Sequence, residues 1–266
     1  MGSIVAMGYR NLIDAATLSG SGWHASYPLT NLQDRRLWTY ARTSGTSADI
    51  IIDHGSAKPM GVFALFGTNI GSADTMTVTV GTTSTGTDVY AAGSAVACWP
   101  FAPLDGVYDG GHFGCWVVLP ADVTARYARI QVSGSAVIRI ARPFVGPVWR
   151  PTYSPSYSGF AEGWGEPNST VMTGDSGADT VWQRREQREV AYDLSVLTPE
   201  SASELDEIVR THSITEEVAH VRHVHDREVQ QQYGFLGRLR RLSALEHPFY
   251  GPRSASVAIT GRGGAA

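Results

Sequence analysis

Short runs that alternate apolar and polar residues dominate the first half of the chain. Residues 75–80 alternate threonine with an apolar residue, which is typical of a strand with one buried face. Gly and Ser clusters separate further apolar runs at 49–53, 62–66, 116–119, 127–132 and 137–140. Because no helical pattern lies between these runs, the spacing predicts a β-sandwich or jelly roll over residues 1–147.

The segment that follows, residues 148–180, has a different character. Prolines and aromatic residues are interleaved from residue 143 to residue 168, and this composition predicts an extended connector without regular structure. The many aromatic residues argue against a flexible linker. We expect the connector to lie against a surface of this chain or of a neighbour, with a ligand groove as the alternative.

A second strand-rich segment follows the connector and contains one helix. Apolar and polar residues alternate at 189–196, which predicts a strand with one apolar face. Thr198 and Pro199 suit the cap and the first position of a helix over residues 199–211. Apolar residues then recur at helical spacing, at Ala202, Leu205, Ile208 and Val209. The pattern predicts an amphipathic helix packed on a sheet.

The last part of the chain completes this second domain. Three more strands are expected at 219–224, 233–242 and 255–260. With parts of the connector they define a domain over residues 181–262, and residues 263–266 are expected to form a disordered tail. The predicted fold class is therefore mainly β, with an N-terminal jelly-roll β-sandwich and a C-terminal β-domain carrying one flanking α-helix.

Composition narrows the classes of function. Charged residues make up 17% of the chain, below the roughly 25% of average globular proteins. The net charge is −4, so no basic excess favours nucleic-acid binding. Lys58 is the single lysine, and arginine suits buried interfaces better than lysine does, although a GC-rich genome would have the same effect. No apolar run approaches the ~20 residues of a membrane span, and the N-terminus lacks a secretory pattern.

The candidates for chemistry are sparse. Three histidines and an aspartate, His220, His223, His225 and Asp226, form the best metal candidate, but on a strand only two of the histidines share a face. Three aspartates are candidate calcium ligands: Asp105, Asp109 and Asp122. The commoner alternative is that their side chains are solvated in loops. The Gly174–Gly177 turn around Ser176 lacks the strand–turn–helix context of a nucleophile. We therefore expect no catalytic residue, metal or cofactor, and no enzyme.

The two cysteines, Cys98 and Cys115, lie in apolar and aromatic surroundings. Two cysteines do not make a disulfide framework, so buried free thiols are expected. A single bridge between neighbouring strands stays open, because spacing alone does not decide it.

The first domain resembles the galactose-binding-like, or discoidin-type, β-sandwich. The resemblance rests on residues 27–34 followed by Trp38, on the strand 48–53 followed by His54-Gly55, and on residues 125–130. Members of that family bind sugars or lipids through loops at one end, which implies a host glycan as a partner. The candidate loop aromatics are Trp23, Trp99 and Tyr108, with core packing as the alternative for each.

The C-terminal domain resembles the ring-forming, tail-tube-like β-sandwich of distal tail and baseplate proteins of long-tailed bacteriophages. The similar segments are 184–196, 199–211 and 232–237, and residues 11–14 fit the same proteins. The resemblance implies a virion protein made in the bacterial cytoplasm, a homo-oligomeric ring (hexamer or trimer), and tail-tube, baseplate and tip proteins as partners. The expected subunit-interface residues are Arg184, Arg185, Arg188, Tyr233, Phe235, Arg238 and Arg240.

Three hypotheses follow from these patterns. The first is a structural component of a phage tail tip or baseplate that forms a ring. The second is a carbohydrate-binding module that recognises a host surface glycan through the sandwich. The third is a hydrolase, which requires two carboxylates roughly 5–10 Å apart in a cleft. No pair of acidic residues in the sequence stands out for that role, so the first hypothesis is favoured.

Overall fold

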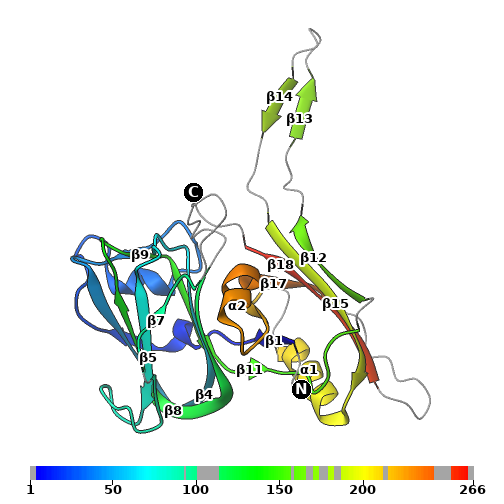
Figure 1. Ribbon diagram of the computed structural model, residues 1–266, viewed down its shortest axis with the longest axis horizontal. Coiled ribbons are helices and arrows are strands. Elements are labelled where there is room, and N and C mark those ends of the chain that lie inside the picture. Colours follow the sequence, from blue (N-terminus) through cyan, green and yellow to red (C-terminus); the bar gives the residue numbers. More distant parts are fainter. Residues whose placement is uncertain are drawn as a thin grey trace.

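The computed structural model describes residues 4–92, 94–100, 114–156, 159–165, 170–173, 179–182, 187–211, 215–242 and 253–262. It has two domains side by side, a β-sandwich and a curved sheet with two helices (Figure 1). The predicted fold class, mainly β with a sandwich and a flanking α-helix, is confirmed.

The sandwich is built around one branched seven-stranded sheet. Its strands are β2 (Thr17–Ser19), β4 (Ser47–Phe66), β5 (Thr75–Gly81), β6 (Tyr90–Ala91), β7 (Val96–Ala97), β8 (Cys115–Ser133) and β10 (Arg142–Gly146). A separate two-stranded sheet and two 3₁₀ helices flank it: β3 (Ala41–Arg42), β9 (Arg139–Ile140), η1 (Leu12–Ala15) and η2 (Leu29–Gln33).

Two very long strands, β4 and β8, organise the sandwich. Each joins two runs that the sequence pattern separates: 49–53 and 62–66 in β4, and 116–119 and 127–132 in β8. The first run of β4 ends at His54-Gly55. The β4–β8 pairing continues past it, with register shifts between Asp53 and Lys58 and between Met60 and Val62. The first half of β4 pairs with β2 and the second half with β10, so the long strands serve both layers. Side chains of both halves meet in one core.

The second domain has a seven-stranded sheet in the order β11-β1-β16-β17-β18-β15-β12. Its strands are β1 (Val5–Gly8), β11 (Val148–Trp149), β12 (Phe160–Gly165), β15 (Gln187–Leu197), β16 (Val218–Arg222), β17 (Phe235–Leu242) and β18 (Arg253–Gly261). A separate antiparallel pair is formed by β13 (Thr170–Thr173) and β14 (Asp179–Trp182).

The domain boundary differs from the expected one at residue 1. Strand β1 pairs with β11 and β16 of the second sheet, with Met7 opposite Trp149 and His220. The sandwich is therefore inserted between two neighbouring strands of the other domain. Such insertions are compatible with folding when the two ends of the inserted domain lie close together, and the β1–β11 pairing brings them together here.

Helix α1 (Pro199–Thr211) matches the predicted range. It buries Ala202, Leu205 and Ile208 in a core shared with one face of the second sheet. A second helix, α2 (Arg227–Tyr233), lies between β16 and β17, where the sequence pattern predicted no helix. Asp226 caps it by accepting a hydrogen bond from the Val229 amide at 3.2 Å, which satisfies a free amide of the first turn.

The two domains share a tight apolar junction. Gly8 at the end of β1 shows how closely they approach, because a Cβ there would lie 2.8 Å from Phe144 and 2.9 Å from Val62. The cluster draws on both domains and contains Ala6, Leu37, Val62, Ala64, Phe66, Trp116, Ala141, Phe144, Val148, Ala219, Val221 and Leu236. The junction is therefore packed like a core, and not like a flexible hinge.

A buried ion network closes the same junction. Arg142 of the sandwich is fully buried, and its Nη2 lies 2.7 Å from Oε2 of Glu217, which precedes β16 in the second domain. Arg142 also pairs with Asp14 and donates to the Leu32 carbonyl at 3.2 Å. Arg262 pairs with the other oxygen of Glu217. Each buried charge thus has a partner, as burial requires.

We expect Glu217→Gln to lower the free energy of unfolding by about 3–5 kcal/mol, because it leaves the Arg142 guanidinium buried with less compensation. The double variant Arg142→Met with Glu217→Met should lose less, since the fully buried guanidinium is then removed together with its partner. Urea denaturation measures both. Glu207→Gln is the control, because its ion pair with Arg210 is exposed and contributes little. A double variant that is less stable than the single one would contradict this account.

Both thiols lie inside the sandwich, with Cys98 1% and Cys115 2% exposed and neither in a disulfide. Burial raises the pKa of Cys115, and a hydrogen bond with Cys98 adds to the effect.

We expect iodoacetamide to modify the native thiols far more slowly than those of the denatured chain, because the thiolate is the reactive species. Mass spectrometry after timed quenching measures this, and equal native and denatured rates would contradict it.

Candidate functional site

Strand β12 forms one edge of the second sheet. Among the described strands it pairs only with β15, so no described strand lies along its other side. An exposed edge of this kind is a template for pairing with another chain. Trp164, near the end of β12, leaves 47% of its surface exposed.

An arginine–aromatic cluster holds this edge against the inner face of the sheet. Arg222 of β16 pairs with Glu162 of β12 although three strands separate the two in the sheet. Its guanidinium carbon lies 5.0 Å from the Phe160 ring centre and 4.5 Å from that of Tyr233. Contact across so many strands requires a strongly curled sheet, and the cluster fills its concave side.

The electrostatics of the cluster follow from burial. Burial lowers the pKa of Arg188 to about 10, while Glu162 acts in the opposite direction, so the guanidinium stays charged at neutral pH. Burial raises the pKa of Glu162, and Arg222 and Arg188 oppose that shift. The Arg188 guanidinium also stacks on Trp164 at 4.7 Å. Glu162 therefore attracts both guanidiniums, and the aromatic rings add cation–π contacts.

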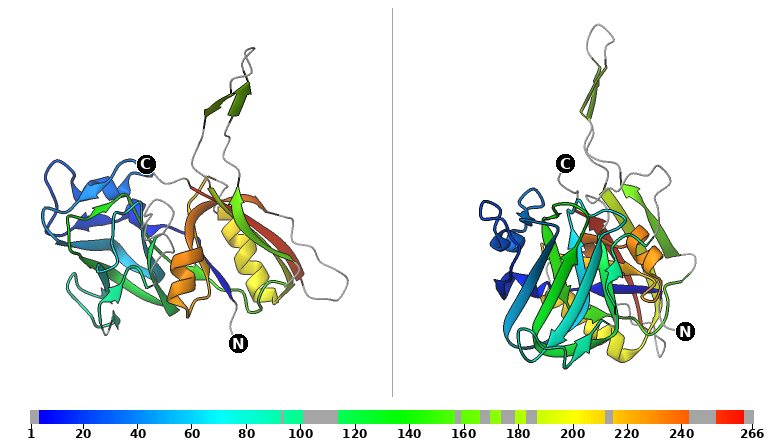
Figure 2. Two further views of the ribbon diagram at one scale, coloured as in Figure 1. Left: turned by 45° about the horizontal axis from the view of Figure 1, so that its top comes forward. Right: turned by 60° about the vertical axis from the view of Figure 1, so that its left-hand side comes forward.

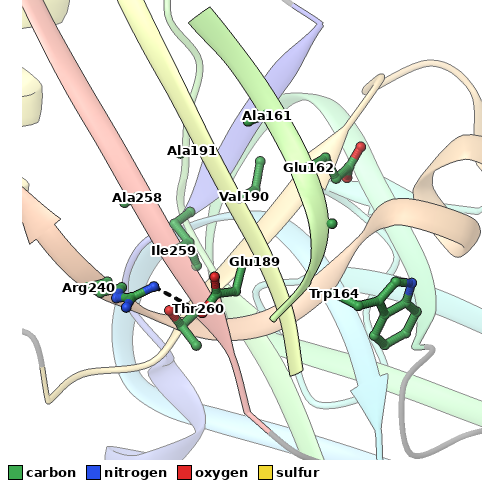
Figure 3. Close-up of a pocket in the computed structure, with 11 residues that line it drawn as sticks. Ala161, Glu162, Trp164, Glu189, Val190, Ala191, Arg240, Ala258, Ile259 and Thr260 are labelled. Atoms are coloured by element: carbon green, nitrogen blue, oxygen red, sulfur yellow. Dashed lines mark hydrogen bonds and ion pairs between the residues drawn. The ribbon is translucent and has the colours of Figure 1, made fainter. Parts of the chain in front are cut away.

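The outer face of the same strands is shallow and open. A hollow of about 280 Å³ lies over small side chains of three strands, Ala161, Gly163, Ala191 and Ala258. Figure 3 shows Glu189, Arg240 and Thr260 gathered at one end of it, with the Glu189–Arg240 ion pair at 3.1 Å. Small side chains on a sheet allow another backbone or side chain to approach closely.

The β13–β14 pair forms an arm beside this edge. It is antiparallel, with Val171 opposite Val181, and in Figures 1 and 2 it stands away from both domains. Met172 on the arm is 62% exposed. A two-stranded unit of this length has marginal stability in water without further packing.

The predicted interface residues are divided by the structure. Arg188 and Tyr233 belong to the inner cluster and are half-buried, whereas Arg238 and Arg240 are exposed. Phe235 is a correction: it is 3% exposed and packs on His220, because its side chain points into the core. Arg184 and Arg185 lie outside the described residues.

The predicted loop aromatics are not presented on a common surface. Trp99 is a correction, because it is 5% exposed and belongs to the sandwich core. Trp23 is half-buried, and its Nε1 donates to the Asp49 carbonyl at 2.7 Å, so its polar end is used internally. Tyr108 lies outside the described residues.

The histidine candidates are also separated. His220 is fully buried, and His223 lies in a turn with a positive φ of 53°. No group of three potential metal ligands occurs among the described residues. Asp122 binds Arg150 at 2.7 Å and the Val148 amide at 3.0 Å, which gives it a structural role. Asp105, Asp109 and the turn at 174–177 lie outside the described residues.

A surface feature of the sandwich was missed in the sequence patterns. Four side chains form a continuous stack, which we call the Arg–Tyr ladder: Arg42, Tyr27, Tyr40 and Arg139. The two tyrosine rings stack in parallel with centres 5.0 Å apart. The guanidinium carbon of Arg42 lies 5.0 Å from the Tyr27 ring, and that of Arg139 lies 5.4 Å from the Tyr40 ring. Residues from three separate segments contribute, so no local motif could reveal it.

Comparisons with known proteins bear on about half of the chain. No protein-family model and no curated protein matches it. Similar solved structures include chitosan-binding module 1 of a chitosanase/glucanase from Paenibacillus sp. IK-5, at 17% identity and a TM-score of 0.37, over 51% of this chain and 98% of that one. CBM32-1 of a family 31 glycoside hydrolase from Clostridium perfringens matches at 17% identity and a TM-score of 0.40, over 52% and 98%. None of the described helices is long and apolar enough to cross a bilayer.

We expect His220→Phe to reduce the loss of unfolding free energy that acid causes. Burial, reinforced by Arg222 and Arg188, lowers the pKa of His220 to about 3, and neither ring nitrogen has a hydrogen-bond partner. The neutral form is therefore favoured in the folded state. This contribution is complete above the unfolded pKa near 6.5 and is lost as the pH falls toward 3.

Urea denaturation at about pH 7 and about pH 5 measures the effect. The unmodified chain should lose roughly 2 kcal/mol more than the variant over this interval. Equal losses would contradict the assignment of a buried, neutral imidazole.

Proposed function

We propose that the chain is a structural, non-enzymatic subunit that assembles with copies of itself through the C-terminal domain. The observation that carries this proposal is the position of β12 at the edge of the described sheet, together with the β13–β14 arm. An edge strand and a two-stranded arm both gain stability when another chain covers them. The exposed side chains of Trp164 and Met172 add apolar surface at the same place.

The form of assembly that this arrangement favours is a ring. The β12 edge and the far edge of the sheet, at β11, are different surfaces, so a contact between the β12 edge of one copy and the β11 edge of the next is head-to-tail. Head-to-tail contacts close into rings when the rotation between subunits is a fixed fraction of a turn. We propose a ring in the tail tip or baseplate of a bacteriophage, a hexamer or trimer that joins the tail tube to tip or receptor-binding proteins.

Gly163→Lys tests the assembly surface without disturbing the fold. A Cβ at Gly163 meets nothing within 4 Å, so the lysine projects from the outer face and places a charge in the contact. Gly45→Lys is the matched control, because Gly45 is equally open but lies in the sandwich. Light scattering should give several times 28.6 kDa for the unmodified chain and the control, and a lower mass for Gly163→Lys.

Images of negatively stained particles should then show closed rings for the unmodified chain. Met172→Lys should reduce the mass as well, because the exposed arm would carry a charge into the contact. A monomeric unmodified chain at high concentration, or an unchanged mass for Gly163→Lys, would contradict the proposal.

A second candidate function is saccharide binding by the sandwich. The Arg–Tyr ladder favours it, since guanidinium donors on a rigid surface are suited to the polar substituents of a sugar. In this arrangement the sandwich would recognise a glycan of the host surface while the other domain holds the assembly together.

A further inference from the structure

We propose that the Arg–Tyr ladder binds a carboxylate-bearing, acidic saccharide. This inference rests on the second candidate function, saccharide binding by the sandwich, and adds the charge of the ligand and the residues that select it. Arg42 and Arg139 are the residues that select an acidic ligand, because their guanidiniums form the two ends of the ladder.

The charge of the ladder lacks compensation within the described part of the chain. Three other arginines stack on aromatic rings and also pair with an acid: Arg36 with Asp34, Arg126 with Asp53, and Arg222 with Glu162. Arg42 and Arg139 stack on their tyrosines, yet no described acid pairs with either one. The Arg42 Nε is moreover buried without a hydrogen-bond partner.

The two arginines also occupy one residue pair of the sheet, from which their side chains reach the two ends of the ladder. Arg42 and Arg139 are directly opposite each other in the β3–β9 pair. Like charges at opposite positions of neighbouring strands repel, so this arrangement costs stability in the free protein. An anion bound to either guanidinium would offset that cost. A carboxylate suits each of them, because it accepts paired hydrogen bonds from one guanidinium.

The backbone under the ladder is held rigidly. Asn31 donates to the Tyr40 carbonyl at 2.9 Å, and Asn69 accepts from the Arg139 amide at 2.6 Å while donating to the Val137 carbonyl at 2.9 Å. Ala41 and Ile140, the other residue pair of β3 and β9, are buried in the core. A preorganised surface loses little entropy when a ligand binds.

An exposed aromatic ring close to the ladder in the sequence favours a sugar over a simple anion. Trp38, two residues before Tyr40, is 69% exposed, and the guanidinium carbon of Arg36 lies 5.9 Å from its ring centre. A large aromatic face in solvent is costly for a free surface and offers a stacking platform for a pyranose ring. Aromatic platform and unpaired guanidiniums together match a ring that carries a carboxylate.

Calorimetric titration of the full chain with trigalacturonate tests the proposal, with the fully methyl-esterified trisaccharide and sodium sulfate as parallel probes. The ester keeps the rings and removes the charge, and sulfate keeps the charge without rings. We expect trigalacturonate to bind, and both other probes to bind roughly tenfold or more weakly. Arg139→Gln should weaken trigalacturonate binding by a similar factor.

Arg126→Gln is the matched control variant. Arg126 also stacks on a tyrosine of the sandwich, at 4.9 Å from the Tyr127 ring, but it is paired with Asp53. The Arg126→Gln substitution should therefore leave trigalacturonate binding unchanged. Equal binding of acid and ester would overturn the acidic ligand while leaving saccharide binding in place. Equal binding of sulfate would overturn the saccharide. No binding by any probe, or no effect of Arg139→Gln, would overturn the site.

Discussion

The contact between Arg142 and Glu217 is the constraint on which the arrangement of this protein depends. A fully buried guanidinium from the last strand of the sandwich meets a carboxylate that is 3% exposed and belongs to the other domain. Removing either partner strands a charge away from water, which is far more costly than losing an exposed ion pair. The two domains therefore keep one relative position, and the apolar junction around Phe144 and Trp116 packs to the density of a core.

This rigid connection separates the two proposed surfaces. In Figure 1 the β9 strand that carries Arg139 lies in the sandwich on the left, whereas β12 and the β13–β14 arm lie in the second domain on the right. A subunit held in an assembly through its β12 edge would leave the Arg–Tyr ladder free. The sandwich is inserted between β1 and β11, so the chain connects the two domains twice. Two connections restrict the orientation of the sandwich more than a single linker would.

Local patterns predicted much of the secondary structure but little of the candidate sites. Alternation located β5, and the Thr198-Pro199 start located α1, since both signals are carried by neighbouring residues. The same reasoning divided β4 in two, because Gly55 marks a bend in a paired strand as readily as a turn. It also placed Trp99 and Phe235 at surfaces, although their side chains are buried, because aromatic residues suit cores and interfaces equally.

The sequence by itself determined that this protein is mainly β and that the helix α1 flanks a sheet. Those features depend on periodicity and capping, which act over a few residues. Only the tertiary structure decided that β1 belongs to the second domain, that Arg142 is buried against Glu217, and that Arg42 and Arg139 end one aromatic stack. Each of these joins residues far apart in the chain, and such contacts arise from the packing of whole layers, which no local pattern records.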